Sequence, residues 1–327
     1  MKNFTCKLAD RSVSFELTNW AEQANGNVLV RMGETVTLVT AVMAREELSN
    51  QGFFPLTVDY EEKFYAAGKI LGSRFIRREG RPSDEAIITA RLIDRAIRPL
   101  FPKNFLREVQ IICTCLSWDT QNDPDMSGLL GASLALSLSD IPWKGPLAAV
   151  RIGRIQGNFV LNPTYQERLE SDLDFVLAGV KQGDEFLFNM VEAESDEAPE
   201  EVYEQALAFA KPFLVQLVEF QEQIIVEEGR QKIRQLADSS ENQTAGFAEL
   251  EKEFRTWLEP KLEQALFQGD KRARMAQVEA VKKEYITLVQ EKYKEEADMQ
   301  KHARFFFEEA FFLAAGFLFA AFFFFAI

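Results

Sequence analysis

The sequence predicts an α+β domain followed by a small all-helical domain, and three observations support this prediction. Runs rich in β-branched residues, bounded by turn residues, predict strands as far as about residue 225. Helical patterns alternate with these strands. After the polar stretch 239–244, nearly every residue up to about Arg304 is a good helix former. The predicted divisions are a first domain at 1–230, a helical domain at 245–304 and an apolar tail at 305–327.

Turn dipeptides order the predicted strands. Gly33-Glu34 separates the run 28–32 from the run 35–43, which predicts a hairpin. A second hairpin is predicted at 147–155 and 159–161, on either side of Gln156-Gly157-Asn158. The other predicted strands are 53–60, 109–118, 173–179 and 186–194.

Three helices are predicted among these strands. The apolar run 129–139, rich in small residues, predicts a buried helix. A long helix is predicted from near Pro199 to about Val226, with a kink at Pro212. The third begins after Ser83, a good capping residue, and ends at Pro99.

Arginines gather on and before this third helix, although the formal net charge of the chain is -14. From Arg74 to Arg107 there are nine basic residues against four acidic ones. Arg91, Arg95 and Arg98 are spaced i, i+4, i+7 and form one stripe on the helix. The residues predicted to lie largely opposite, toward a core, are Leu92, Ile93, Ala96 and Ile97.

The loop before the helix adds Arg77, Arg78 and Arg81, and Phe75 is an aromatic residue available for stacking. Guanidinium groups hold phosphates and aromatic rings stack on bases, so this combination suits single-stranded RNA. The alternative is a solvated helix face, with Arg95 or Arg98 paired to carboxylates such as Asp94 or Glu61-Glu62.

Composition excludes several kinds of site. His302 is the only histidine, which rules out Ser-His-Asp and Cys-His nucleophiles and His-ligated zinc. Cys6, Cys113 and Cys115 lack the spacing of a disulfide framework, so we predict buried thiols. The first residues contain no apolar signal region. Together these features indicate a cytoplasmic protein.

Several segments together resemble the first RNase PH-like core of bacterial polynucleotide phosphorylase, also named polyribonucleotide nucleotidyltransferase. The resemblance extends over roughly residues 8 to 230, and the charged region after 245 is similar to the helical linker domain of that family. The segments that carry it are FFPLTVDYEEKFYAAGKI (53–70), FIRREGRPSDEAIITARLIDRAIRPLFP (75–102), NDPD (122–125), GASLALSLSDIP (131–142) and FVLNPTYQERLESDLDFVLAG (159–179).

The resemblance implies a fold, an activity and an assembly. The fold is the RNase PH-like core, a ribosomal protein S5 domain 2-like βα fold. The activity is phosphate-dependent degradation of single-stranded RNA from its 3′ end to nucleoside diphosphates with Mg²⁺, as part of mRNA decay, and it also runs in reverse. Subunits form a homotrimeric ring, and an RNA-decay assembly is a further expected partner. Residues matching Phe75, Ile76, Arg77 and Arg78 line the channel and hold RNA. Arg81, Arg91, Arg95 and Arg98 are candidates for extending this contact.

The resemblance also implies that this core is not the catalytic one. The family's catalytic core holds its metal with Asp, five residues, Asp, one residue, Lys, and the matching positions here are Arg168, Asp174 and Val176. Serines that bind phosphate there match the segment 123–125, which reads Asp-Pro-Asp. Two carboxylates repel phosphate, and proline offers no N–H. No catalytic residue is therefore assigned, and Mg²⁺ is not expected on this core.

Three alternatives remain open. Asp172 and Asp174 are weak candidates for metal ligands, and the alternative is that they are ordinary solvent-exposed carboxylates. The chain is alternatively a stand-alone RNA-binding or assembly subunit that needs a separate catalytic partner. The third alternative is an active enzyme whose catalytic residues align differently.

The apolar tail consists almost entirely of Phe, Ala and Leu, and 310–327 contains 18 residues without a charge. It begins where the resemblance implies a second core, so we favour a truncated chain with a disrupted or misread end. A membrane anchor and a helix that awaits a partner surface are the alternatives.

Overall fold

The structure is a computed structural model in which the chain divides into two compact units, Met1–Arg234 and Gln235–Ile327. The residues that the structure describes are 2–47, 54–70, 72, 80–102, 105–183, 185–233, 241–267, 271–294, 299–300, 302–303, 306–307 and 310–311.

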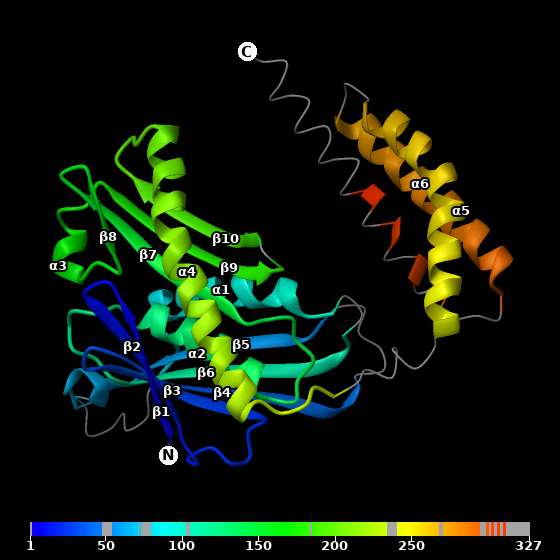
Figure 1. Cartoon of the computed structure of the whole chain (residues 1–327). Helices are drawn as coiled ribbons and strands as arrows, with labels where there is room; N and C mark the ends of the chain where they lie inside the picture. Colours follow the sequence, from blue (N-terminus) through cyan, green and yellow to red (C-terminus); the bar gives the residue numbers. More distant parts are fainter. Residues whose placement is uncertain are drawn as a thin grey trace. The chain divides into compact units, whose positions relative to one another are not determined.

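The first unit contains a six-stranded sheet in the order β1-β2-β3-β4-β6-β5 (Figure 1). Its strands are β1 Lys2–Leu8, β2 Arg11–Leu17, β3 Gly26–Met32, β4 Thr35–Glu47, β5 Leu56–Glu62 and β6 Arg107–Ser117. β5 pairs with β6 in parallel, and the other neighbours are antiparallel. Met32 pairs with Thr35 across the β3–β4 turn, which confirms the first predicted hairpin.

A second, four-stranded sheet has the order β10-β9-β7-β8 and is antiparallel throughout. Its strands are β7 Leu147–Ile155, β8 Asn158–Leu161, β9 Leu173–Gln182 and β10 Glu185–Ser195. β7 and β8 form the second predicted hairpin, with Ile155 opposite Asn158. The short helix α3 Tyr165–Arg168, which the sequence analysis did not predict, lies between β8 and β9.

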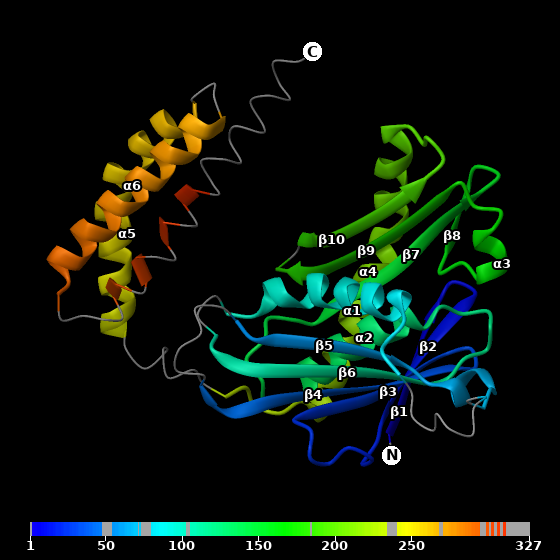
Figure 2. The same ribbon diagram turned by 180° about the vertical axis from the view of Figure 1, so that it is seen from behind.

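Helix α2 Pro124–Leu138 is the centre of the first unit (Figures 1 and 2). Every residue from Asp125 to Leu138 is buried, as predicted for this apolar run. The helix lies so close to the large sheet that a Cβ on Gly131 would be 2.4 Å from Cγ2 of Val39. A Cβ on Gly26 would likewise be 2.1 Å from the carbonyl oxygen of Ala135, so both positions require glycine.

Two further helices pack in this unit. Helix α1 Asp84–Ile97, continued by the 3₁₀ turn η2 Arg98–Leu100, contacts β5. Helix α4 Glu200–Glu228 covers β7 and β9 and contains Pro212. A second 3₁₀ turn, η1 Phe64–Ala67, follows β5. The predicted mixture of strands and helices is confirmed.

The three cysteines are free and buried, as predicted. Cys113 and Cys115 both point from β6 into the interior. Burial raises the pKa of Cys115 to about 11, so this thiol stays protonated and unreactive at neutral pH.

The second unit contains α5 Glu241–Leu266 and α6 Lys271–Lys292. Its core includes Leu250, Phe254, Tyr285, Phe306 and Phe307. In the part of the chain that the structure describes, no helix is both long and apolar enough to cross a bilayer. The tail beyond 311 lies outside that part.

Candidate functional site

The arginines of helix α1 lie on its outer face because the opposite face packs in the core. The Ser83 hydroxyl accepts a hydrogen bond from the Ala86 N–H at 3.0 Å, and it donates one to the Glu62 carboxylate at 2.8 Å. This cap fixes the start of the helix beside the end of β5. The predicted core residues of the opposite face, Leu92, Ile93, Ala96 and Ile97, are all buried.

The three arginines of the stripe have different surroundings. Arg91 is exposed. The guanidinium of Arg95 contacts the Glu192 carboxylate of β10 at 2.7 Å, in an exposed ion pair. Arg98 binds both oxygens of Asp94 at 2.9 Å.

Arg98 also donates hydrogen bonds to the carbonyl oxygens of Phe54, at 3.2 Å, and Leu56, at 3.1 Å. The pair with Asp94, left open by the sequence, is therefore present for Arg98, while Arg95 uses a carboxylate from β10. Arg98 ties α1 to the beginning of β5, whereas Arg91 extends from the surface.

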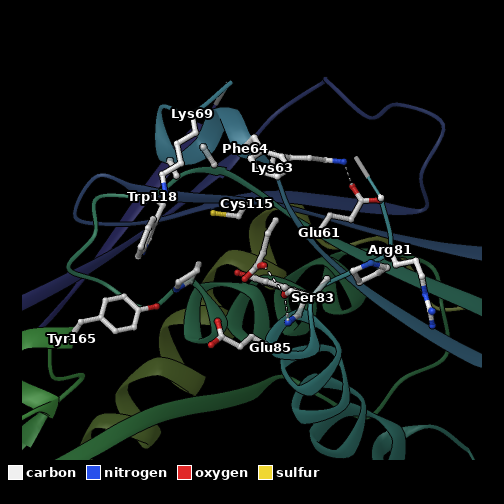
Figure 3. A pocket seen from close by; sticks show the side chains of 18 residues that line it. Glu61, Lys63, Phe64, Lys69, Arg81, Ser83, Glu85, Cys115, Trp118 and Tyr165 are labelled. Atoms are coloured by element: carbon white, nitrogen blue, oxygen red, sulfur yellow. Dashed lines mark hydrogen bonds and ion pairs between the residues drawn. The ribbon is translucent and has the colours of Figure 1, made fainter. Parts of the chain in front are cut away.

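The loop residues Phe75, Ile76, Arg77 and Arg78 lie outside the described residues. Arg81, which follows them, is exposed and borders a pocket of about 680 Å³. The walls come from the ends of β5 and β6, from η1, from the beginning of α1 and from the first residues of α2 and α3 (Figure 3).

The pocket combines aromatic and charged side chains. Trp118 and Tyr165 meet edge to face with ring centroids 5.9 Å apart. Figure 3 shows Glu85 near the Tyr165 side, with Phe64 and Lys63 across the pocket from them. Such a concave, partly aromatic site with a few charged groups is typical of small-molecule and base-binding pockets.

Beside this pocket, three carboxylates and two guanidinium groups form a compact cluster. Asp123 caps α2 and Asp125 lies in its first turn, Asp174 lies on β9, Arg151 on β7 and Arg168 on α3. Arg151 contacts Asp174 at 2.7 Å and also contacts Asp125. Arg168 contacts Asp123 at 2.7 Å and Asp174 at 2.8 Å. We call these five residues the Asp–Arg cluster.

Burial governs the electrostatics of the Asp–Arg cluster. Burial, together with the nearby Asp123, raises the pKa of Asp125 to about 7, against the opposing effect of Arg151. Burial by itself lowers the pKa of Arg151, but the carboxylates of Asp125, Asp174 and Asp123 outweigh it and raise the pKa. Arg151 therefore stays charged, and the ion pairs with Arg151 and Arg168 offset most of the negative charge of the carboxylates.

Tyr165 connects the Asp–Arg cluster to the pocket. Thr164 and Glu167 form a capping box that fixes α3, and the Arg168 guanidinium lies 5.6 Å from the centre of the Tyr165 ring. Burial, followed by the carboxylates of Asp123 and Asp125, raises the pKa of Tyr165, so its hydroxyl stays protonated at neutral pH.

Comparison with known proteins places this architecture. The sequence models of the 3′ exoribonuclease family match the chain at residues 9–142 for domain 1 and at 145–211 for domain 2. The chain belongs to the 3′ exoribonuclease family. The matched residues of this RNase PH family core contain both sheets except β1, together with α1, α2 and the Asp–Arg cluster.

Among curated proteins, the chain is similar to polyribonucleotide nucleotidyltransferases. It is 43% identical over 296 residues to that of Heliobacterium modesticaldum, covering 90% of this chain and 40% of the relative. It is 46% identical over 278 residues to that of Halalkalibacterium halodurans, covering 85% of this chain and 38% of the relative. The chain thus spans about two fifths of the length of these relatives.

Solved structures share the fold at low identity. The crystal structure of rice Rrp46 superposes with a TM-score of 0.54 at 12% identity, covering 65% of this chain and 93% of that one. An Archaeoglobus fulgidus exosome chain, solved with RNA bound to the active site, gives 0.50 at 17% identity, covering 64% and 87%. The predicted RNase PH-like core is therefore confirmed.

Four residues of the Asp–Arg cluster, Asp123, Asp125, Arg168 and Asp174, are among the positions that the resemblance matches to metal and phosphate ligands of the family's catalytic core. Asp174, the retained ligand, is bound by two arginines. Asp172, the other metal candidate, is bound by Arg154 at 2.8 Å. Neither carboxylate is simply solvated, and within the described ranges no group of three or more His, Cys, Asp or Glu is arranged to hold a metal ion.

The sequence analysis missed Arg151. It is one of two arginines in the apolar strand LAAVRIGRI, and the strand is buried around it. A charge in the middle of such a run is a signal of a buried ion pair, because an unpaired buried charge is costly. The signal does not reveal the partners, which lie 26 and 23 positions away in the chain.

Proposed function

We propose that this chain is the first, non-catalytic core of a polyribonucleotide nucleotidyltransferase and that it binds single-stranded RNA and contributes to a homotrimeric ring. The observation that carries the proposal is the Asp–Arg cluster. A metal ion at Asp174 would have to displace Arg151 and Arg168, which contact its carboxylate at 2.7 and 2.8 Å. A phosphate would meet Asp123 and Asp125 in place of N–H and O–H donors.

The phosphorolytic activity belongs, in this proposal, to the whole polypeptide rather than to this core. Phosphate attacks the 3′-terminal linkage, and a nucleoside diphosphate leaves. Mg²⁺ would offset the charge that develops on the transferred phosphoryl group, held by residues outside this core. The whole protein acts in mRNA decay in the cytoplasm, as part of an RNA-decay assembly.

RNA binding by this core rests on the arginines of α1 and of the segment before it. Phe75, Ile76, Arg77 and Arg78 provide the central contact. Arg81, which precedes α1, and Arg91, on α1, are exposed and extend the contact. Arg95 and Arg98 remain candidates, although each guanidinium already binds a carboxylate and would have to bind an RNA phosphate in addition.

A phosphorolysis assay tests the proposal. The purified chain is incubated with 5′-labelled single-stranded RNA and Mg²⁺, with and without phosphate, and RNA retention is measured by filter binding in parallel. We expect retention without shortening. Phosphate-dependent shortening from the 3′ end would show that this core is catalytic and refute the proposal, and a chain that does not retain RNA would refute the binding role.

A further inference from the structure

The pocket beside α1 contains a carboxylate that the proposed function does not use. Glu61 pairs with Lys63 at 3.0 Å, and Glu62 accepts the hydrogen bond of the Ser83 cap. Glu85 also lines the pocket and is exposed. Among the described residues, its carboxylate forms no hydrogen bond or ion pair, so it can accept from a ligand.

Aromatic rings border the same space. Trp118 and Tyr165 form a right-angled corner, with an interplanar angle of 87°. A flat ring that stacks on one of them is perpendicular to the other and presents its edge to it, which is a favourable arrangement for aromatic groups. The pocket volume of about 680 Å³ exceeds that of a base, so a complete nucleotide fits.

The charges around the pocket determine which part of a nucleotide enters. Arg81 and Lys69 are exposed and line it. Pro124, on the wall formed by α2, has no N–H, and Asp123 and Asp125 flank it in the sequence. A phosphate is therefore attracted to Arg81 or to Lys69, which Figure 3 shows on different sides of the pocket, whereas Pro124 offers it no N–H donor.

A carboxylate that meets the edge of a base distinguishes the four bases. Guanine presents two adjacent donors, N1–H and the 2-amino group, which match the two oxygens of a carboxylate. Adenine and cytosine place a ring-nitrogen acceptor beside their amino group, and uracil flanks its single N–H with two carbonyl oxygens. Each of those acceptors faces the second carboxylate oxygen unfavourably.

We propose that this pocket is a guanine-binding subsite, in which Glu85 binds the N1–H and 2-amino edge, Trp118 or Tyr165 stacks on the base, and Arg81 or Lys69 holds the phosphate. The inference rests on the proposed RNA-binding function when the base belongs to a strand. A free guanine nucleotide has the same chemistry, and the experiment separates these two sources.

The experiment uses the full chain. Calorimetric titrations with GMP and AMP measure base selectivity, and filter binding compares oligouridylates with and without one internal guanosine. We expect GMP to bind about tenfold more tightly than AMP, since one bidentate pair contributes that order of discrimination. We expect the guanosine-containing strand to gain a similar factor over oligouridylate and GMP to compete with it.

Glu85→Gln is the decisive variant because it replaces one acceptor oxygen by a donor. It should abolish the preference for GMP and leave AMP binding unchanged. Asp84→Asn is the matched control: it removes the same charge from the same first turn of α1 but does not line the pocket. We expect the control to bind GMP within about twofold of the unmodified chain.

The outcomes separate the two proposals. Equal GMP and AMP affinities, or an effect of Asp84→Asn as large as that of Glu85→Gln, would refute the guanine subsite. If oligouridylate is retained in that case, the RNA-binding function stands. GMP selectivity without a gain for the guanosine-containing strand would refute the strand as the source and identify a free nucleotide as the ligand.

Discussion

Arginines in two regions of this core have opposite consequences. On the surface of α1, Arg91 is exposed and Arg81 borders an open pocket, so their guanidinium groups can meet a ligand. In the Asp–Arg cluster, Arg151 and Arg168 form ion pairs with three aspartates. The difference is the distance to the nearest carboxylate. It shows that a count of arginines does not measure anion-binding capacity until the partners are known.

The strongest test of this comparison removes Arg151. Its side chain is 10% exposed, and it contacts Asp125 and Asp174. Arg151→Met leaves these carboxylates with less counter-charge in a low dielectric, so we expect a loss of about 3–5 kcal/mol in the free energy of unfolding. Urea denaturation measures it. Arg154→Met, which breaks the more exposed pair with Asp172, is the control and should cost much less.

A loss no larger than that of the control would mean that the Asp–Arg cluster contributes little to stability. The arginines would then be no more committed than those of α1, and the comparison would fail.

The second prediction concerns the loop. Arg77→Ala together with Arg78→Ala should weaken binding of single-stranded RNA about tenfold, because two phosphate contacts are lost. The logarithmic salt slope should fall by about 1.4, at roughly 0.7 for each contact with a single strand. Filter binding at several salt concentrations measures both quantities. An unchanged slope would remove the loop from the proposed interface.

The third prediction separates two arginines of the same stripe. Arg91→Ala should weaken RNA binding a few-fold, lower the salt slope by about 0.7 and leave stability unchanged, because Arg91 is exposed. Arg98→Ala should instead lower the free energy of unfolding by about 1 kcal/mol, since it removes bonds to Asp94 and to the carbonyls of Phe54 and Leu56. Thermal unfolding and filter binding of both variants show whether the two effects separate.

The sequence predicted most of the fold because its local signals agree with the tertiary structure. The two hairpins follow glycine-containing turns, and the buried helix follows an apolar run. The β1–β2 hairpin was not predicted, although Phe4, Cys6 and Leu8 alternate with polar residues. Its turn contains Ala9 at a φ of 52°, a conformation usually adopted by glycine or asparagine, so the sequence contained no turn residue that would mark this hairpin.

The site was less predictable for a different reason. The arginine stripe follows from spacing along one helix, which the sequence contains directly. The pairing of Arg98 with Asp94 is also local and was foreseen as an alternative. The partners of Arg95, Arg151 and Arg168 come from other elements, and only the packing of β7, β9, β10 and α2 brings them together.

The smallest predicted effect concerns the loop that leads into the Asp–Arg cluster. Asp119 accepts hydrogen bonds from the N–H groups of Gln121, at 2.8 Å, and Asn122, at 2.7 Å, just before Asp123 begins α2. Burial tends to raise its pKa, but the hydrogen bonds from Asn122, Gln121 and Thr35 outweigh it and lower the pKa to about 2.

Because the pKa of Asp119 is lower in the folded state than its ordinary value of 3.8, the ionised carboxylate stabilises the fold above about pH 4. This contribution is lost as the pH falls toward 2. Asp119→Asn should therefore be slightly less stable than the unmodified chain at pH 7 and nearly equal to it close to pH 2. Asp10→Asn, at a side chain that is 80% exposed, is the control. Urea denaturation across this range measures the difference, and a difference that persists at the lowest pH would mean that the charge of Asp119 does not hold the loop.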